Sequence, residues 1–188
     1  MSAERITAYF DEHGAANTDE VLRLAVARAE ELDIQHIVVA SYSGETALKA
    51  VKAFEGRTVT VVAGTYGRLR PNEGPMTDER RTEIEEAGGR LLFAGHSFGM
   101  MGRAVRRKLG AIQIDEIIAH VLRLFGHGVK VACEITCMAA DAGLIPVGQE
   151  CIAIGGTESG ADAAIVIRAS NTHTFFETRV HEIICKPR

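Results

Sequence analysis

The sequence predicts an α/β fold, a three-layer α/β/α sandwich around a mostly parallel sheet, and two observations support this. Short, continuously apolar segments rich in β-branched residues recur along the chain. An expected helix precedes each of the first three, with apolar residues at helical spacing in the first two and mostly charged residues in the third. Helices that alternate with buried strands are typical of a parallel sheet covered on both faces. The expected strands are residues 36–40, 58–63, 90–94, 151–155, 163–168 and 178–185.

The last three of these strands are expected to pair antiparallel. Residues 156–162 and 169–177 connect them, and both connections are too short for the crossover helix that a parallel pair needs. The sheet should therefore be mixed at its C-terminal end.

The helices follow from apolar spacing and from the residues at their ends. Asn17, with Glu20 three residues later, resembles a capping box at the start of the first helix. Gly143 and Pro146 are typical of the end of the last one. The expected helices are residues 18–32, 45–54, 77–87, 99–109, 114–125 and 129–142.

Composition narrows the class of protein. The 188 residues contain neither a linker nor a repeat, so we expect a single domain over residues 1–188. Lys and Arg number 21 against 25 Asp and Glu, which argues against a nucleic-acid partner. The sequence shows no signal peptide and no apolar stretch of the ~18 residues that span a membrane, so we expect a cytoplasmic protein without a membrane partner. The four cysteines are expected to be buried thiols, and no metal site is predicted.

Polar loops follow the expected strands, where open α/β sheets bind ligands. In the first, Ser41, Ser43 and Thr46 surround Gly44 at the start of a helix. Hydroxyls and the free N–H groups of a first helical turn are suited to a phosphate. The alternative is that Ser43 only caps the helix. The loop lacks the lysine of a nucleotide triphosphatase.

Two further loops are weaker candidates. Residues 155–162 are rich in glycine and form either a hairpin beside a ligand or a flexible β-turn. His96 follows the third expected strand and is either an acid or base near neutral pH or a loop residue bonded to the backbone. The basic run Arg103, Arg106, Arg107 and Lys108 is interpreted as a solvated helix face.

Several segments together resemble one family. They are Asn17-Thr18-Asp19-Glu20, IVVASYSGETALKA at 37–50, MAADAGLIPVGQECIAIGGTESGADAA at 138–164 and EIICKPR at 182–188. The resemblance is to stand-alone proteins similar to the carboxy-terminal α/β domain of pyruvate kinase. It implies the same three-layer sandwich. Ser41, Ser43, Gly44 and Thr46 match the loop that holds a phosphate of a sugar-bisphosphate effector in pyruvate kinases, and the stand-alone relatives imply FMN as a cofactor.

The sequence also departs from pyruvate kinase. The catalytic barrel is absent, so phosphoryl transfer from phosphoenolpyruvate is not expected and no complete pyruvate kinase is predicted. Glu45 stands where the kinases often have Arg, which weakens the sugar-bisphosphate interpretation.

Three functions are compatible with these features. The first is binding of a small phosphorylated molecule, FMN above all, with the ring against Tyr42, Tyr66 or Phe98. The second is a non-catalytic effector-sensing module that acts as a homo-oligomer, with residues 114–124 and 129–142 partly in the interface. The third is an enzyme with His96 as its acid or base. The candidate binding residues are Asn17, Thr18, Ser41, Tyr42, Ser43, Gly44, Glu45, Thr46, Thr65, Tyr66, His96, Ser97, Gly155, Gly156 and Thr157.

Overall fold

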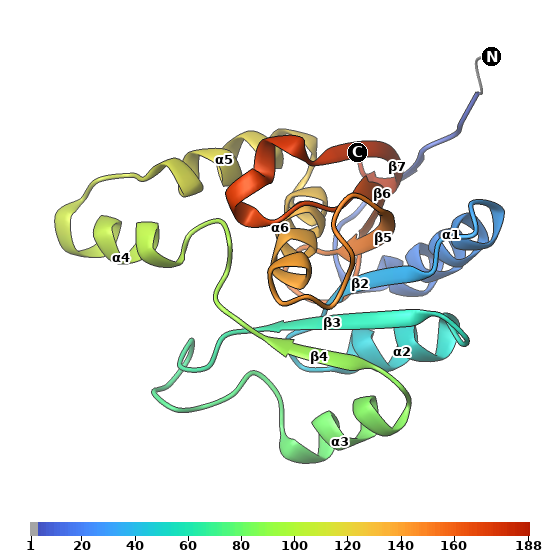
Figure 1. Cartoon of the computed structure of the whole chain (residues 1–188), viewed down its shortest axis with the longest axis horizontal. Helices are drawn as coiled ribbons and strands as arrows, with labels where there is room; N and C mark the ends of the chain where they lie inside the picture. Colours follow the sequence, from blue (N-terminus) through green and yellow to red (C-terminus); the bar gives the residue numbers. More distant parts are fainter. Residues whose placement is uncertain (1–3) are drawn as a thin grey trace.

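A computed structural model describes residues 4–188 and contains a seven-stranded mixed sheet with the strand order β1-β7-β6-β5-β2-β3-β4 (Figure 1). The strands are β1 (Ala8–Phe10), β2 (His36–Ala40), β3 (Thr58–Gly64), β4 (Arg90–Phe93), β5 (Glu150–Gly155), β6 (Ala163–Arg168) and β7 (Arg179–Pro187). The α-helices are α1 (Thr18–Glu31), α2 (Glu45–Ala53), α3 (Asp78–Glu86), α4 (Met100–Leu109), α5 (Ile114–Leu122) and α6 (His127–Asp141). Three 3-10 turns are η1 (Ala15–Asn17), η2 (Arg123–Phe125) and η3 (Thr172–Glu177).

The sheet is parallel except around β6. β2 pairs parallel with β3 and β5, and β3 pairs parallel with β4. β6 lies antiparallel between β5 and β7, as its short connections predict. β1 pairs parallel with β7 at the edge of the sheet. The expected mixed sheet is confirmed.

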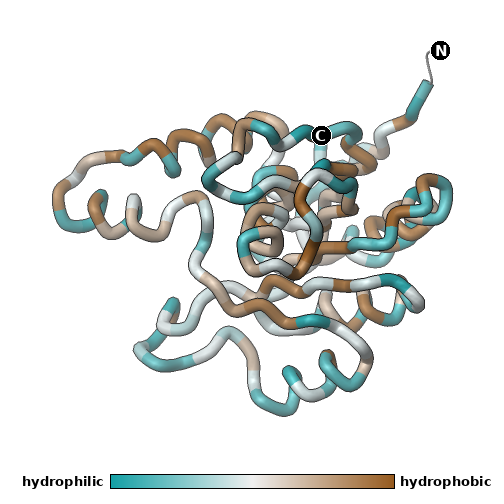
Figure 2. The backbone as a smooth tube through the Cα atoms, in the orientation of Figure 1, coloured by the Kyte–Doolittle hydropathy of each residue, from teal (hydrophilic) through white to brown (hydrophobic). Residues whose placement is uncertain are grey.

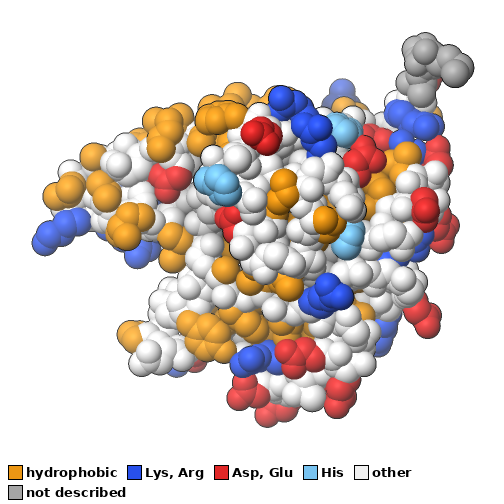
Figure 3. Space-filling model, viewed as in Figure 1, with side chains coloured by type: hydrophobic (Ala, Val, Ile, Leu, Met, Phe, Trp, Pro, Cys, Tyr) orange, Lys and Arg blue, Asp and Glu red, His pale blue; other side chains and the backbone are white. Residues whose placement is uncertain are grey.

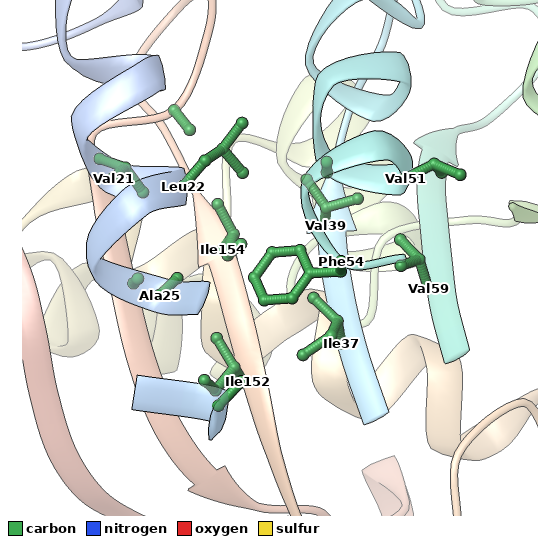
Figure 4. Close-up of a cluster of buried hydrophobic side chains, with 14 of the residues drawn as sticks. Val21, Leu22, Ala25, Ile37, Val39, Val51, Phe54, Val59, Ile152 and Ile154 are labelled. Atoms are coloured by element: carbon green, nitrogen blue, oxygen red, sulfur yellow. The ribbon is translucent and has the colours of Figure 1, made fainter. Parts of the chain in front are cut away.

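Each face of the sheet has its own apolar core. On one face α1, α2 and α3 cover the strands, and Phe54 at the end of α2 lies between the side chains of Ile37, Val39, Ile152 and Ile154 (Figure 4). On the other face α6 packs against the sheet, with α5 beside it. Twelve of the fifteen residues of α6 are buried, so this helix is core. The expectation that residues 129–142 lie partly in an interface is therefore wrong.

Two features of the N-terminal region differ from the prediction. β1 is too short to show an apolar pattern and is stabilised by β7, which is distant in sequence. The capping box is also wrong, because η1 precedes α1 and gives Asn17 a helical conformation with φ −90° and ψ −9°. Its side-chain amide donates to the Glu12 carbonyl instead. At the other end of the chain, the short connection over residues 169–177 contains the 3-10 turn η3 and no crossover helix.

The four cysteines are all buried, and burial raises the pKa of each thiol to about 12. Between residues 4 and 188, no helix combines the length and the apolar character required to cross a membrane.

Candidate functional site

A cleft of about 590 Å³ lies at the carboxyl ends of β2, β3 and β5. The loops after these strands form one side, and α4, η2 and α6 form the other. Its lining residues are Ala40, Ser41, Tyr42, Ser43, Glu45, Thr46, Val62, Ala63, Gly64, Arg68, His96, Arg103, Arg123, His127, Lys130, Val131, Glu134, Ile135, Gly156, Glu158, Ser159 and Gly160. The predicted rim is therefore a hollow, of a size that holds small ligands.

The loop between β2 and α2 presents hydroxyls and helix-terminal amides to this cleft. Ser41 is buried, and its Oγ accepts from the Ala47 amide at 3.1 Å, so Ser41 rather than Ser43 stabilises the first turn of α2. Ser43 is exposed, which leaves its hydroxyl available to a ligand. Thr46 lies in the first turn of α2 and is mostly buried. The open end of α2 attracts an anion.

Gly44 has a structural role in the same loop. Its φ is +89°, a left-handed conformation that glycine adopts without strain. A Cβ at this position would lie 2.4 Å from Cγ of Arg80, so α3 packs directly against the glycine. Gly44 shapes the loop but does not itself line the cleft.

Basic side chains line the cleft from several elements. Arg68 follows β3 and lies over the Tyr42 ring at 4.7 Å, Arg103 comes from α4, and Arg123 from η2. Within residues 4–188, none of the three forms an ion pair with a carboxylate. An arginine without a counter-charge at a ligand-sized cleft favours an anionic ligand.

Lys130 and Glu134 form a buried ion pair in the cleft wall. Lys130 Nζ donates to Glu134 Oε2 at 2.6 Å, the Phe98 amide donates to Oε1 at 3.0 Å, and His96 Nδ1 lies 3.3 Å from Oε2. Burial raises the pKa of the Glu134 carboxyl, but the contacts with His96 and Lys130 outweigh it and hold that pKa below its ordinary value. Burial lowers the pKa of Lys130, with Glu134 opposing. Glu134 thus orients both the lysine and the histidine.

The glycine-rich loop after β5 is held in place rather than flexible. Asp162 is fully buried, and its Oδ2 accepts from the amides of Gly14 at 3.0 Å and Thr157 at 3.1 Å. A Cβ on Gly155 would lie 2.2 Å from the Gly128 carbonyl oxygen, and one on Gly160 would lie 2.4 Å from Cα of Ala15. These glycines permit close packing against α6 and η1, and the loop presents Gly156 and Ser159 to the cleft.

The structure brings together some of the predicted site residues and separates others. Ser41, Tyr42, Ser43, Glu45, Thr46, His96 and Gly156 line the cleft. The other candidates lie outside its wall: Asn17, Thr18, Gly44, Thr65, Tyr66, Ser97, Gly155 and Thr157.

Most of these outlying side chains are engaged elsewhere. The Thr18 hydroxyl accepts from the Ala161 amide, Ser97 contacts the Thr172 hydroxyl, and Thr65 donates to the Tyr66 carbonyl. The Tyr66 ring packs on Phe93 with centroids 5.6 Å apart. Phe98 is buried, with its ring against Phe175. Of the three aromatic residues expected to contact a flavin, only Tyr42 lines the cleft.

The basic wall of the cleft is not predicted from the sequence. The expected solvated helix face is confirmed for Arg106, which is exposed and pairs with Glu116 at 2.8 Å. Arg103 is partly buried and faces the cleft instead. Lys130 and Glu134 had a signal, since two opposite charges four residues apart in an otherwise apolar helix indicate a buried pair.

The described residues form an α/β fold with a cleft at the carboxyl ends of its parallel strands. Residues 19–167 match the family model described as "Pyruvate kinase, alpha/beta domain". The chain therefore belongs to the pyruvate kinase α/β domain family.

Solved structures similar to this chain include pyruvate kinases from Cryptosporidium parvum. One has a TM-score of 0.42 and 14% identity over 81% of this chain. A second, in complex with ADP, has a TM-score of 0.41 and 17% identity over 83% of this chain. The matched part covers only 23% and 24% of those pyruvate kinase chains.

Proposed function

We propose that this protein binds a small phosphorylated ligand in the cleft, with loop 41–46 holding the phosphate. One observation carries the proposal: the open end of α2 and the arginines Arg68, Arg103 and Arg123 line the same hollow. Four cationic side chains, including Lys130, exceed the three carboxylates of Glu45, Glu134 and Glu158 in its wall. The excess of positive charge favours an anion.

The expected energies are sufficient for specific binding. The end of a helix favours an anion by about 0.3–1 kcal/mol when exposed and up to ~2 kcal/mol when partly buried. Each hydrogen bond from an amide or hydroxyl to the charged phosphate adds about 1.5–3 kcal/mol before desolvation is subtracted. Arginine adds bidentate contacts suited to phosphate oxygens.

FMN is the particular ligand that we propose. Its phosphate suits loop 41–46, and Tyr42, Val131 and Ile135 offer the ring one aromatic and two aliphatic contacts. The fit to the phosphate is better than the fit to the ring, because Tyr66 and Phe98 do not line the cleft. No redox step is assigned to the cleft, and an acid–base role for His96 stays a prediction.

Calorimetry with three probes tests the site and the ligand separately. Inorganic phosphate tests the anion site, FMN tests the complete ligand, and riboflavin tests the ring without the phosphate. We expect FMN to bind more tightly than the other two. Binding of phosphate without tighter binding of FMN would contradict FMN while retaining the phosphate site. Binding of neither phosphate nor FMN would contradict the proposed function.

A charge substitution assigns the binding to the loop. Ser43→Asp places a carboxylate where the phosphate is expected, and because Ser43 is exposed and does not cap α2, the fold should survive. We expect this variant to lose at least about 90% of the affinity for FMN. Thr77→Asp is the matched control, because Thr77 is the exposed N-cap of the neighbouring α3 and Asp retains that role. Equal affinity in both variants would contradict the assignment.

A further inference from the structure

Helix α5 carries apolar side chains on two faces, and only one of them is packed. Ile118, Ala119 and Leu122 lie against the core on the α6 side of the sheet. Ile114, Ile117, Val121 and Leu124 point outward and are 70%, 48%, 53% and 82% exposed. A helix that is apolar on both sides is normally buried on both. The outward face of α5 therefore lacks a partner within residues 4–188.

The outward residues have the spacing of side chains at a helix–helix interface. Ile114, Ile117, Val121 and Leu124 follow one another at intervals of three, four and three residues along α5 and into η2. This is the spacing with which the a and d positions of two helices interlock. Scattered exposed apolar residues need no explanation, but a regular stripe of this kind indicates a helix–helix contact.

The stripe belongs to a larger apolar surface, which we call the arm and define as residues 100–125. α4 and α5 extend away from the sheet as a pair (Figure 1), and α5 is apolar along most of its length (Figure 2). Apolar side chains gather on this part of the surface, with charged groups at its edges (Figure 3). Further exposed members lie on or beside α4, namely Met100, Met101, Leu109 and Ile112, with Phe125 following the stripe.

The arm has little packing of its own. Gly102 of α4 allows close approach of α5, because a Cβ there would lie 2.2 Å from Oδ1 of Asp115. Arg106 pairs with Glu116 across the two helices at 2.8 Å. These contacts join α4 to α5 but leave the outward stripe in water. Covering the stripe would stabilise the arm through the hydrophobic effect.

We propose that two copies of this chain associate through their arms, with the α5 stripes packed against one another around a two-fold axis. The arm exposes nine large apolar side chains, each at least 40% exposed. Together they present an area comparable with the ~800 Å² that each partner buries in a standard interface. A stripe with a and d spacing is complementary to a second copy of itself, as an isologous contact requires.

The two α5 helices are expected to pack antiparallel. This orientation is compatible with a two-fold axis and places opposite ends of the two helix dipoles side by side, which favours it.

Sedimentation equilibrium over a range of protein concentrations tests the proposal. We expect the unaltered protein to be a dimer at micromolar concentration. Ile114→Glu and Ile117→Glu each place a charge in the stripe and should raise the dimer dissociation constant by at least about tenfold. Ile114 is the first residue of α5, where an acidic residue suits the helix dipole, so Ile114→Glu should fold.

The matched control is Leu69→Glu, on the loop between β3 and α3. Leu69 is 72% exposed and Ile114 is 70% exposed. The two substitutions therefore each replace an equally exposed aliphatic side chain by the same charged one. We expect Leu69→Glu to remain as dimeric as the unaltered protein, with circular dichroism confirming the fold of every variant. A monomer at all concentrations would overturn the proposal, as would a dimer that both arm substitutions leave unchanged or that Leu69→Glu weakens equally.

Discussion

Asp162 illustrates how one residue organises a loop that the sequence shows only as glycine-rich. Its carboxylate is fully buried and accepts from two amides, those of Gly14 and Thr157. One amide precedes η1 and the other lies in the loop after β5, so Asp162 joins segments about 150 residues apart in sequence. A buried carboxylate persists only where such donors compensate its desolvation.

We expect Asp162→Ala to lower the free energy of unfolding by about 2–4 kcal/mol, because the two amides lose a charged acceptor and stay buried. Urea denaturation followed by circular dichroism measures the change. Asp19→Ala is the control, since Asp19 forms only an exposed pair with Lys49 and should cost at most about 1 kcal/mol. Similar losses in the two variants would show that Asp162 has no organising role.

At this scale the sequence predicts the position of a site residue better than its orientation. Ser43 and His96 follow strand ends and line the cleft, as expected from the direction of parallel strands. Tyr66 follows a strand end too, but its ring turns to Phe93 and its hydroxyl accepts from Arg81. Long-range contacts determine such orientations, and no local pattern encodes them.

Helix α6 is the element that joins the core to the cleft. Most of its surface is apolar and packs on the sheet, while Lys130 and Glu134 place a charged pair at its cleft-facing side. Because the pKa of Glu134 is lower in the folded chain than its ordinary value of about 4.3, the pair stabilises the fold above that pH. That stabilisation is lost as the pH falls through the lowered pKa.

We expect Lys130→Met to lower the free energy of unfolding by about 3–5 kcal/mol at neutral pH, because it leaves the Glu134 carboxylate buried without its cation. Adding Glu134→Gln removes that charge and keeps an acceptor for the Phe98 amide, so the double variant should recover at least about 1 kcal/mol. Urea denaturation of the unaltered protein and of each variant measures these free energies of unfolding. Arg23→Met breaks an exposed pair and serves as the control, with a cost of at most about 1 kcal/mol. A double variant less stable than Lys130→Met alone would refute this account.

The elements themselves follow closely from the sequence. The apolar segments predict β2 and β6 at their observed bounds, because both strands are buried for most of their length. β1 and η3 escape prediction for a physical reason: three residues of strand carry no period, and the conformation of η3 depends on contacts such as the Asp141 carboxylate with Thr172. The local sequence pattern therefore predicts the buried strands, whereas tertiary contacts determine the short elements at the ends of the chain.

At the scale of the whole molecule, the arm and the cleft share residues. Arg103 lies on α4 and Arg123 on η2, so two of the three arginines that line the cleft come from the segment that we propose as the dimer interface. A second copy that holds the arm in one position therefore also restricts the positions of these two side chains. A bound anion, in turn, reduces the repulsion among Arg103, Arg123 and Lys130.

We therefore expect ligand binding and dimerisation to favour one another. Thermodynamic linkage requires that a ligand which binds the dimer better also tightens the dimer by a corresponding factor. Couplings between sites in one protein typically amount to about 5–150-fold. The dimer dissociation constant should fall by a factor in this range when FMN saturates the unaltered protein, as sedimentation equilibrium would measure. At the lowest FMN concentration that saturates the unaltered protein, Ser43→Asp should show a smaller fall. If FMN binds the unaltered protein by calorimetry but does not alter its dimerisation, the arm and the cleft act independently, and Arg103 and Arg123 serve the ligand without transmitting its presence to the interface.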